Sequence, residues 1–222
     1  MPQDELSEAQ RVLELLIHDL RTPLSVAQGY VRLLQENRLH ADDERQQAFT
    51  GTMKALGHIA RLCDDAASYT AAPTAVPPPG ATVRTETVVE QVERACAKTP
   101  PSTLSFVVPA VLKGTLRVGA PEDVVHAVTE ILCAVHRAAR LQPRTVVITE
   151  TDEEALFLLS SDGNHASLQA GPVQPFDPWH GGHGVALPLA CRTVARTGGR
   201  VWTTAEVHGC VGIAFPARIV PS

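Results

Sequence analysis

The sequence predicts an α+β protein, in which an N-terminal antiparallel helical hairpin precedes an α/β sandwich. Two patterns predict this fold class. In the first third of the 222 residues, apolar side chains recur at alternating steps of four and three, the heptad spacing of helices packed in a bundle. After a proline-rich segment, helix-like and strand-like segments are intermixed, which is typical of one sheet covered by helices. A hydrophobic fraction of 44% supports a buried core.

The predicted hairpin occupies residues 1–72. A short polar connection at residues 36–47 joins its two helices, which suits an antiparallel pair. One hairpin buries the apolar seams of both helices poorly, so we expect a homodimer that forms a four-helix bundle. The predicted seam residues are Leu13, Ile17, Leu20, Leu24, Ala27, Val31 and Leu34 in the first helix, and Phe49, Met53, Leu56, Ala60, Cys63 and Ala67 in the second.

A linker and a second domain follow the hairpin. Four prolines and a glycine end the second helix, and they predict a stiff linker at residues 73–83. Residues 84–222 form the predicted α/β domain. In it we expect helices at 87–98, 121–140 and 184–199, strands at 103–112 and 114–119, two strands within 145–163, and a β-hairpin at 200–219.

Composition excludes several classes of function. The net charge is −5 and no basic stripe is present, so a nucleic-acid partner is not expected, and aromatic residues make up only 4% of the chain. No stretch approaches 18 uninterrupted apolar residues, and the N-terminus is acidic and polar, so we expect neither a membrane span nor a signal peptide. Five cysteines without a Cys-x-x-Cys pair indicate a reduced, cytoplasmic protein.

One segment of the first helix carries candidate chemistry. Residues 18–25 have the sequence HDLRTPLS. His18 lies one position past the seam residue Ile17, so we expect it at the border of the apolar stripe, facing solvent. An exposed imidazole is largely neutral at cellular pH and can accept a phosphoryl group. Asp19 could hydrogen-bond the ring, fix its tautomer and take a proton as the N–P bond forms.

The next residues extend this candidate site. Thr22 lies four residues after His18, one helical turn away on the same face. Arg21 could offset phosphate charge. Pro23 lacks an N–H, so we expect it to bend the helix and to free the carbonyl of residue 19. Taken by itself, a His-Asp pair on a helix is more often a solvated surface, and the rest of the chain favours the chemical interpretation.

HDLRTPLS resembles the H-box of two-component histidine kinases, and His18, Asp19, Arg21, Thr22 and Pro23 fit that pattern without a gap. In that family the H-box lies in a helical dimerisation hairpin, and a nucleotide-binding α/β domain follows, the order found here. The resemblance implies that His18 is the phosphoacceptor. It also implies that Asp19 and Thr22 can position water for dephosphorylating a partner's aspartyl phosphate.

The α/β domain departs from the family at the helix that chelates magnesium. Alignment of residues 121–140 with that helix puts Glu130 and Ala134 where asparagines usually stand. Ala134 has no oxygen to offer a metal, whereas Glu130 could ligate a cation through its carboxylate. Arg137 stands where the family often has a lysine.

The glycine boxes are also altered. Register from Gly163 puts Ser161 at the place of the adenine-recognising aspartate, and a one-residue slip would restore Asp162 to that role. In the second box Gly182 and Gly184 match, but Ala186 replaces the third glycine. The resemblance therefore implies that Asp162, Gly182 and Gly184 are remnants of a nucleotide site. The spacing of His180, His183 and Asp177 matches no ligand set, so no metal site is predicted.

An intact acceptor histidine beside an altered nucleotide site resembles the kinase-derived histidine phosphotransferases. We therefore expect a phosphorelay protein that accepts and donates a phosphoryl group on His18, with receiver domains of response regulators as partners. No cofactor is expected, because ATP binding is predicted to be lost. Three alternatives remain open at this point: an ATP-dependent histidine kinase with a divergent Mg-ATP site, a non-enzymatic adaptor, and a phosphatase acting mainly through Thr22.

Overall fold

The structure is a computed structural model of the chain. It describes residues 2–36, 38–71, 81–99, 104–118, 120–139, 144–160, 165–170, 173–179, 184–204 and 209–219. The chain divides into two compact units, Met1–Ala72 with Trp179–Ala186, and Pro73–Pro178 with Leu187–Ser222. Each unit is described here by itself.

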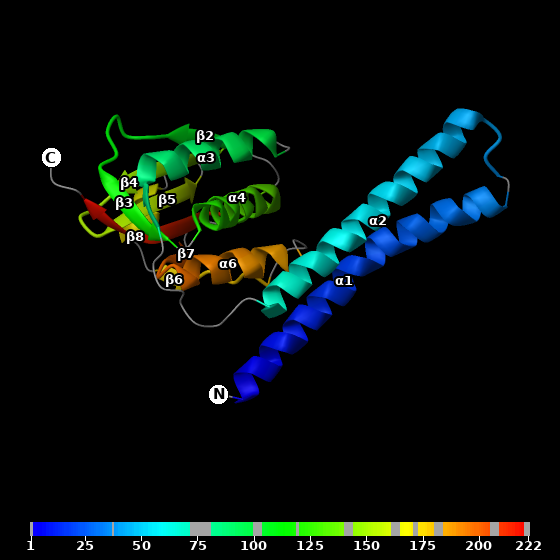
Figure 1. The fold of residues 1–222 in the computed structure, drawn as a ribbon, viewed down its shortest axis with the longest axis horizontal. Coiled ribbons are helices and arrows are strands. Elements are labelled where there is room, and N and C mark those ends of the chain that lie inside the picture. The colour runs from blue at the N-terminus through cyan, green and yellow to red at the C-terminus, as the bar shows by residue number, and fades with distance from the viewer. Residues whose placement is uncertain are drawn as a thin grey trace. The chain divides into compact units, whose positions relative to one another are not determined.

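The first unit is built on two long helices that lie side by side as an antiparallel pair, α1 (Pro2–Gln35) and α2 (Asp42–Ala71) (Figure 1). The connection between them is shorter than the sequence predicts, because residues 42–47 already belong to α2. The carboxylate of Glu44 accepts hydrogen bonds from the backbone N–H groups of His40 and Ala41, and it thereby caps the start of α2. Pro23 is buried inside α1, which continues through it.

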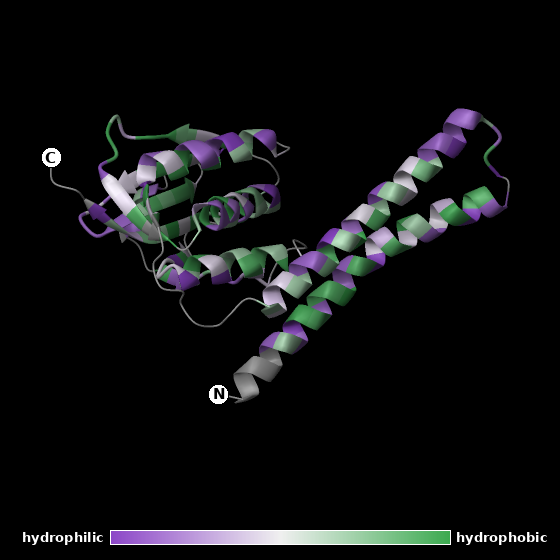
Figure 2. Ribbon diagram, in the orientation of Figure 1, coloured by the Kyte–Doolittle hydropathy of each residue, from purple (hydrophilic) through white to green (hydrophobic). Residues whose placement is uncertain are grey.

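The buried seam of the hairpin is displaced by one residue from the predicted seam. On α2 the buried residues are Ala48, Ala55, Leu62 and Tyr69, which are spaced seven residues apart. The first three each lie one residue before a predicted seam position. On α1, Val12 and Pro23 are buried one residue before Leu13 and Leu24, and Ala27 is buried as predicted. Apolar and polar residues alternate along both helices (Figure 2), so two neighbouring stripes fit the same spacing. Heptad spacing fixes the period, and the packing between helices decides which stripe is inside.

Most of the predicted seam residues instead form a stripe on the outside of the hairpin, here called the outer stripe, whereas Leu20 and Leu34 are half-buried. Leu13, Ile17, Leu24, Val31, Phe49, Met53 and Leu56 are 40–67% exposed. Ala60, Cys63 and Ala67 are exposed as well. A single hairpin thus leaves one apolar stripe uncovered, as expected of a helix pair that is half of a bundle.

The second unit contains a mixed sheet and its helices. In the part of the chain that the structure describes, eight strands follow the order β1-β3-β8-β5-β4-β2, with β7 paired to β8 and β6 to β7. Among the strand pairs in the described residues, only β2 and β4 run parallel. The strands are β1 (Ala81–Arg84), β2 (Leu104–Val107), β3 (Gly114–Val118), β4 (Arg144–Glu150), β5 (Glu154–Ser160), β6 (Val173–Pro175), β7 (Arg200–Thr204) and β8 (Val211–Ile219).

Two apolar cores lie on opposite faces of this sheet. The larger core packs the sheet against α3 (Thr85–Lys98), α4 (Pro121–Ala138) and α6 (Ala186–Arg196), which lie over one face (Figure 1). The smaller core contains Leu168 of α5 (His165–Ala170) and Trp202 of β7. Along β5, Phe157 points into the larger core and Leu158 into the smaller one. This explains why β5 is a continuous apolar run rather than an alternating one.

The elements of the second unit confirm the predicted α+β class, with three additions. Residues 81–83, expected at the end of the linker, form β1 with Arg84. The short α5 and β6 were not expected, because six and three residues are too few to show a periodicity. The remaining linker residues, 73–80, lie outside the described residues. Among the helices that the structure describes, none combines the length and apolarity needed to cross a membrane.

Candidate phosphoacceptor site

His18 is strongly exposed on α1. Its side chain is 76% exposed, whereas that of the neighbouring Asp19 is only 11% exposed. The seam displacement accounts for this contrast: Asp19 falls on the buried side of α1, and His18 stays outside it. The prediction that His18 faces solvent agrees with this placement. Sequence spacing alone did not indicate that Asp19 would be anchored at the buried seam.

A hydrogen bond of 2.8 Å joins His18 Nδ1 to Asp19 Oδ1. Because an ionised carboxylate can only accept, Nδ1 is the donor and carries the hydrogen. In this tautomer the lone pair of a neutral imidazole is on Nε2, the ring nitrogen away from Asp19. The pair therefore presents a fixed, solvent-facing nucleophile at Nε2 and a carboxylate behind it.

Thr22 and Arg21 are also exposed on α1. Thr22 lies one turn after His18, so its hydroxyl can reach solvent near the imidazole. The guanidinium of Arg21 is free to approach an incoming anionic group. Pro23 has no N–H, so the carbonyl of Asp19 lacks its usual helical donor one turn below the site.

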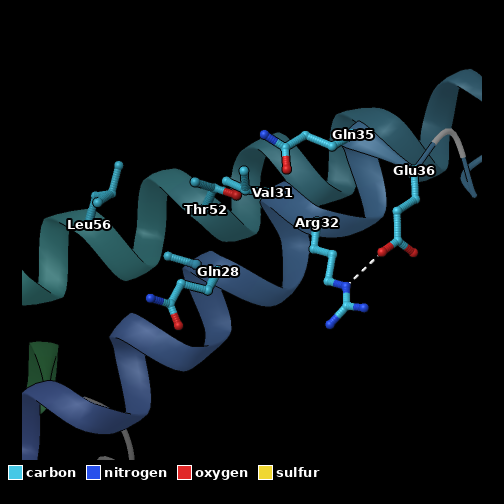
Figure 3. Close-up of a pocket in the computed structure, with 8 residues that line it drawn as sticks. Gln28, Val31, Arg32, Gln35, Glu36, Thr52 and Leu56 are labelled. Atoms are coloured by element: carbon cyan, nitrogen blue, oxygen red, sulfur yellow. Dashed lines mark hydrogen bonds and ion pairs between the residues drawn. The ribbon is translucent and has the colours of Figure 1, made fainter.

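A groove of about 540 Å³ lies along the outer stripe, towards the far end of the hairpin (Figure 3). Arg32 donates to Glu36 at one side of it, with an Nε to Oε1 distance of 2.6 Å. Val31 and Leu56 belong to the outer stripe itself. The groove is thus part of the apolar face that a single hairpin leaves open. Its lining residues are Ala27, Gln28, Val31, Arg32, Gln35, Glu36, Thr52 and Leu56.

In the second unit, the two positions that the resemblance assigns to magnesium chelation lie on α4. Ala134 is buried, 2% exposed, and ends in a methyl group. Glu130 is half-buried and keeps a carboxylate. Magnesium requires oxygen ligands in a near-octahedral set, and a buried methyl cannot supply one. The donor set on α4 therefore does not fit the Mg-ATP complex that this helix binds in the kinases it resembles.

The other remnant positions are described only in part. Asp162 and Gly182 lie outside the described residues. Gly184, in the first unit, adopts a φ of 62°, a backbone conformation that favours glycine. His165, placed near the altered first glycine box, contacts the backbone carbonyl of Thr145 through Nε2 at 3.0 Å, which is a structural contact between α5 and β4. In the part of the chain that the structure describes, no three His, Cys, Asp or Glu side chains gather as a metal site.

Residues 8–70 match the His Kinase A (phospho-acceptor) domain, the family whose acceptor segment HDLRTPLS resembles. Residues 8–70 thus form a segment similar to the phospho-acceptor domain of histidine kinases. No curated protein sequence matches it significantly. The match covers the hairpin and includes every candidate side chain on α1, so the histidine kinase resemblance stated from the sequence is confirmed.

Several solved structures, two of them described as histidine kinases, share the fold. Histidine kinase AdeS of Acinetobacter baumannii is 12% identical with a TM-score of 0.57, and the alignment covers 92% of this chain and 98% of AdeS. Full-length ShkA in complex with AMPPNP is 19% identical with a TM-score of 0.55, covering 96% and 47% of the two chains. Histidine kinase ThkA in complex with response regulator protein TrrA is 12% identical with a TM-score of 0.63, covering 99% and 64%. The chain thus spans under two thirds of the ShkA and ThkA chains that it matches.

Proposed function

We propose that this chain is a phosphorelay protein, which accepts a phosphoryl group on His18 from a receiver-domain aspartate and donates it to another. The observation that carries the proposal is the geometry of the acceptor pair. Asp19, anchored at the hairpin seam, holds Nδ1–H of His18, and Nε2 is left pointing into solvent. A docked receiver domain could bring its aspartyl phosphate to that nitrogen without moving the helix.

The transfer balances with the groups at this site. The lone pair of Nε2 attacks phosphorus, the N–P bond forms, and the bond from phosphorus to the receiver's acyl oxygen breaks, so that the receiver aspartate leaves as a carboxylate. The imidazole gains positive charge during the attack. The carboxylate of Asp19 stabilises that charge and can take the Nδ1 proton. Donation to the next receiver is the reverse reaction.

The absence of a magnesium ligand at Ala134 favours relay over autophosphorylation. A kinase must hold Mg-ATP in its α/β domain, and α4 offers a buried methyl where the resemblance calls for an amide oxygen. A relay protein needs no nucleotide, because the phosphoryl group arrives already activated. We therefore propose that ATP binding is lost and that the protein works without a cofactor.

The partners follow from the surface of the hairpin. The outer stripe is apolar and uncovered, so we propose that a second copy covers it and completes a four-helix bundle. ThkA, which shares the fold, is seen in complex with a response regulator protein. By analogy, we propose receiver domains of response regulators as the partners that dock beside His18.

The first experiment is phosphotransfer between purified proteins. Label supplied as an aspartyl phosphate on one receiver domain should reach a second receiver only when the full chain is present. His18→Ala should abolish this transfer, whereas His58→Ala, an exposed histidine on α2, should leave it unchanged. Transfer that persists in His18→Ala would refute the proposal. A chain that binds receivers equally well with and without His18 but never carries label would be an adaptor instead.

A second arm tests the loss of ATP binding. The chain incubated with γ-labelled ATP and magnesium should acquire no acid-labile label. Label that appears on the wild type and disappears in His18→Ala would identify a kinase and overturn this part of the proposal. Thr22→Ala separates relay from phosphatase activity, because it should slow loss of phosphate to water without slowing transfer between receivers.

A further inference from the structure

The first unit contains a short segment besides the two helices. Trp179–Ala186 groups with the hairpin rather than with the sheet. Among its described residues, Val185 is fully buried, yet it belongs to neither apolar core of the sheet. The ring of Trp179 packs edge-on against Tyr69 of α2, with ring centroids 6.1 Å apart and an interplanar angle of 73°. Because Tyr69 is a buried seam residue, this end of the segment is held against the hairpin.

Gly184 makes the second contact of this segment with the hairpin. A Cβ built on Gly184 would lie 2.9 Å from Cδ2 of Leu62 and 3.5 Å from Oδ2 of Asp19. Leu62 is itself buried in the seam, so it has little room to move away. The φ of 62° is a second reason why this position suits glycine. The backbone at Gly184 therefore lies against both helices, against α2 at Leu62 and against α1 at Asp19.

The two contacts are compatible with each other in length. Leu62 and Tyr69 are seven residues apart on α2, which is two turns or about 10.5 Å along the helix axis. Gly184 follows Trp179 by five residues, and five residues can span up to about 16 Å. One segment can thus contact Tyr69 and Leu62 at the same time without strain on the chain.

The two carboxylate oxygens of Asp19 have different neighbours. Oδ1 accepts the hydrogen bond from Nδ1 of His18 at 2.8 Å, whereas Oδ2 is the oxygen that faces Gly184. The last torsion of an aspartate side chain is broad, so a carboxylate in open solvent turns easily. Here a turn of the carboxylate would move its oxygens against the Gly184 backbone. The contact at Oδ2 therefore keeps Oδ1 on the imidazole of His18.

We propose that Gly184 is a positioning residue for the phosphoacceptor pair, whose backbone keeps the Asp19 carboxylate turned towards Nδ1 of His18. The histidine kinase resemblance assigns this glycine to a nucleotide site, and the proposal gives it a role at the carboxylate instead. The expected effect on phosphotransfer rests on the phosphorelay proposal. The orientation of the pair does not, because it can be measured without any transfer of phosphate.

The tautomer of His18 is the direct test. The full chain is labelled with nitrogen-15 histidine, and ring nitrogen shifts are measured at about pH 8.5, where an exposed imidazole is neutral. Of the nine histidines, His18 is the ring whose signals are missing from His18→Ala. In the wild type His18 should carry its hydrogen on Nδ1. In Gly184→Ala the added methyl should displace the segment and free Asp19 to turn, so His18 should become a mixture of both tautomers.

Gly198→Ala is the matched control. Gly198 also has a positive φ, 78°, but it lies in the second unit, where an added Cβ would meet Cγ of Pro216 at 3.4 Å. The substitution therefore introduces the same kind of backbone strain away from the hairpin. His18 should keep the wild-type tautomer in this variant. Transfer from a labelled receiver should be at least about tenfold slower in Gly184→Ala than in Gly198→Ala.

Trp179 provides a second variant in case Gly184→Ala does not fold. Trp179→Ala removes the contact with Tyr69 without adding an atom near Asp19, and it should also give His18 a mixture of tautomers. Trp179→Phe keeps an aromatic ring and should resemble the wild type. A mixture of tautomers in the wild type, or wild-type tautomers in both Trp179→Ala and a folded Gly184→Ala, would overturn the proposal. If no chain transfers phosphate but the tautomers change as expected, the phosphorelay proposal fails and the positioning role of Gly184 is supported.

Discussion

At the scale of single residues, the roles proposed for His18 and Asp19 rest on their difference in exposure. The His18 side chain is 76% exposed and is open to a partner, whereas that of Asp19 is only 11% exposed. Adjacent positions on a helix point about 100° apart, so one of them can be buried while the next is open. The pair depends on this difference, because a carboxylate in open solvent would hold the ring far less firmly.

Asp19→Asn tests this division. The amide keeps the shape of the side chain but loses the negative charge that stabilises the imidazolium, so phosphotransfer through His18 should slow by about 10²-fold or more. The secondary structure and the size of the particle should not change, since the amide fits the same place. Single-turnover transfer from a labelled receiver measures the rate. A rate equal to that of the wild type would show that Asp19 serves the hairpin rather than the reaction.

We expect His136 to make the stability of the second unit depend on pH. It is buried in α4, and burial, followed by the charges of Arg144 and Arg137, lowers its pKa from the usual 6.5. The unfolded chain therefore takes up a proton at a pH where the folded chain does not. Stability should be fully present above about pH 6.5 and should fall as the pH is lowered from there towards the folded-state pKa.

Urea unfolding at about pH 7.5 and about pH 5.5 measures this loss. His136→Gln removes the titrating group, so its stability should change less between the two pH values than that of the wild type, even if the variant is less stable overall. His126→Gln is the matched control, because His126 is exposed on the same helix. An equal pH dependence in wild type and His136→Gln would rule His136 out as its source.

The sequence indicated the candidate site residues better than their surroundings. HDLRTPLS is a local motif, so a hydrogen bond between His18 and Asp19 could be expected from it, and the structure contains that bond at 2.8 Å. The anchoring of Asp19 at the seam did not follow, because it depends on which side of α1 meets α2.

At the scale of elements, α1 and α2 each carry two apolar stripes one residue apart. A heptad repeat has the same period for both stripes, so periodicity alone cannot say which stripe faces the other helix. Small residues are frequent on the buried stripe, although Leu62 and Tyr69 also belong to it. Ala27, Ala48 and Ala55 let the helices approach closely and are buried, while the larger Phe49 and Met53 remain outside. The sequence thus predicted the helices and their period, but it did not indicate that a second stripe packs α1 against α2 within one chain while most of the predicted seam stays open to a partner.

Met53→Glu tests whether the outer stripe is a self-association surface. Met53 is 67% exposed in the single chain, so a charge there should not unfold the hairpin. In a four-helix bundle the same carboxylate would be buried without an opposite charge, which is unfavourable. The protein should shift from dimer to monomer in a light-scattering or sedimentation measurement. Gln47→Glu, also exposed but on the opposite side of α2, should leave the dimer intact. A Met53→Glu protein that remains dimeric would place the interface elsewhere.

Substitution by alanine should change the stability of the hairpin in opposite directions at two helical glycines, Gly29 and Gly51. A Cβ at Gly29 would have no neighbour within 4 Å, so Gly29→Ala should stabilise the hairpin by about 0.5–1 kcal/mol through helix propensity. A Cβ at Gly51 would lie 2.3 Å from the ring of Tyr30, so Gly51→Ala should destabilise it by about 1–3 kcal/mol. Thermal unfolding followed by circular dichroism compares them. Equal shifts of the two would mean that Tyr30 does not pack on Gly51.

At the scale of the whole molecule, the order of helices and strands along the chain was predictable, whereas the order of the strands within the sheet was not. Turn residues, proline positions and apolar runs gave the helices α3, α4 and α6 and most of the strands, because these are local signals. The neighbours in the sheet are set by pairings across long stretches of chain, such as Leu116 with Ala217. No local pattern encodes such a pairing, and the strand order had to come from the structure.

The central place of β8 has a consequence for synthesis on the ribosome. This strand pairs with β3, β5 and β7, so three parts of the sheet stay incomplete until residues 211–219 have emerged. The hairpin needs only contacts between α1 and α2, which are complete once residue 71 is free. The phosphoacceptor hairpin can therefore fold while most of the second unit is still being translated, and the apolar strands β3 to β5 must wait exposed until β8 arrives.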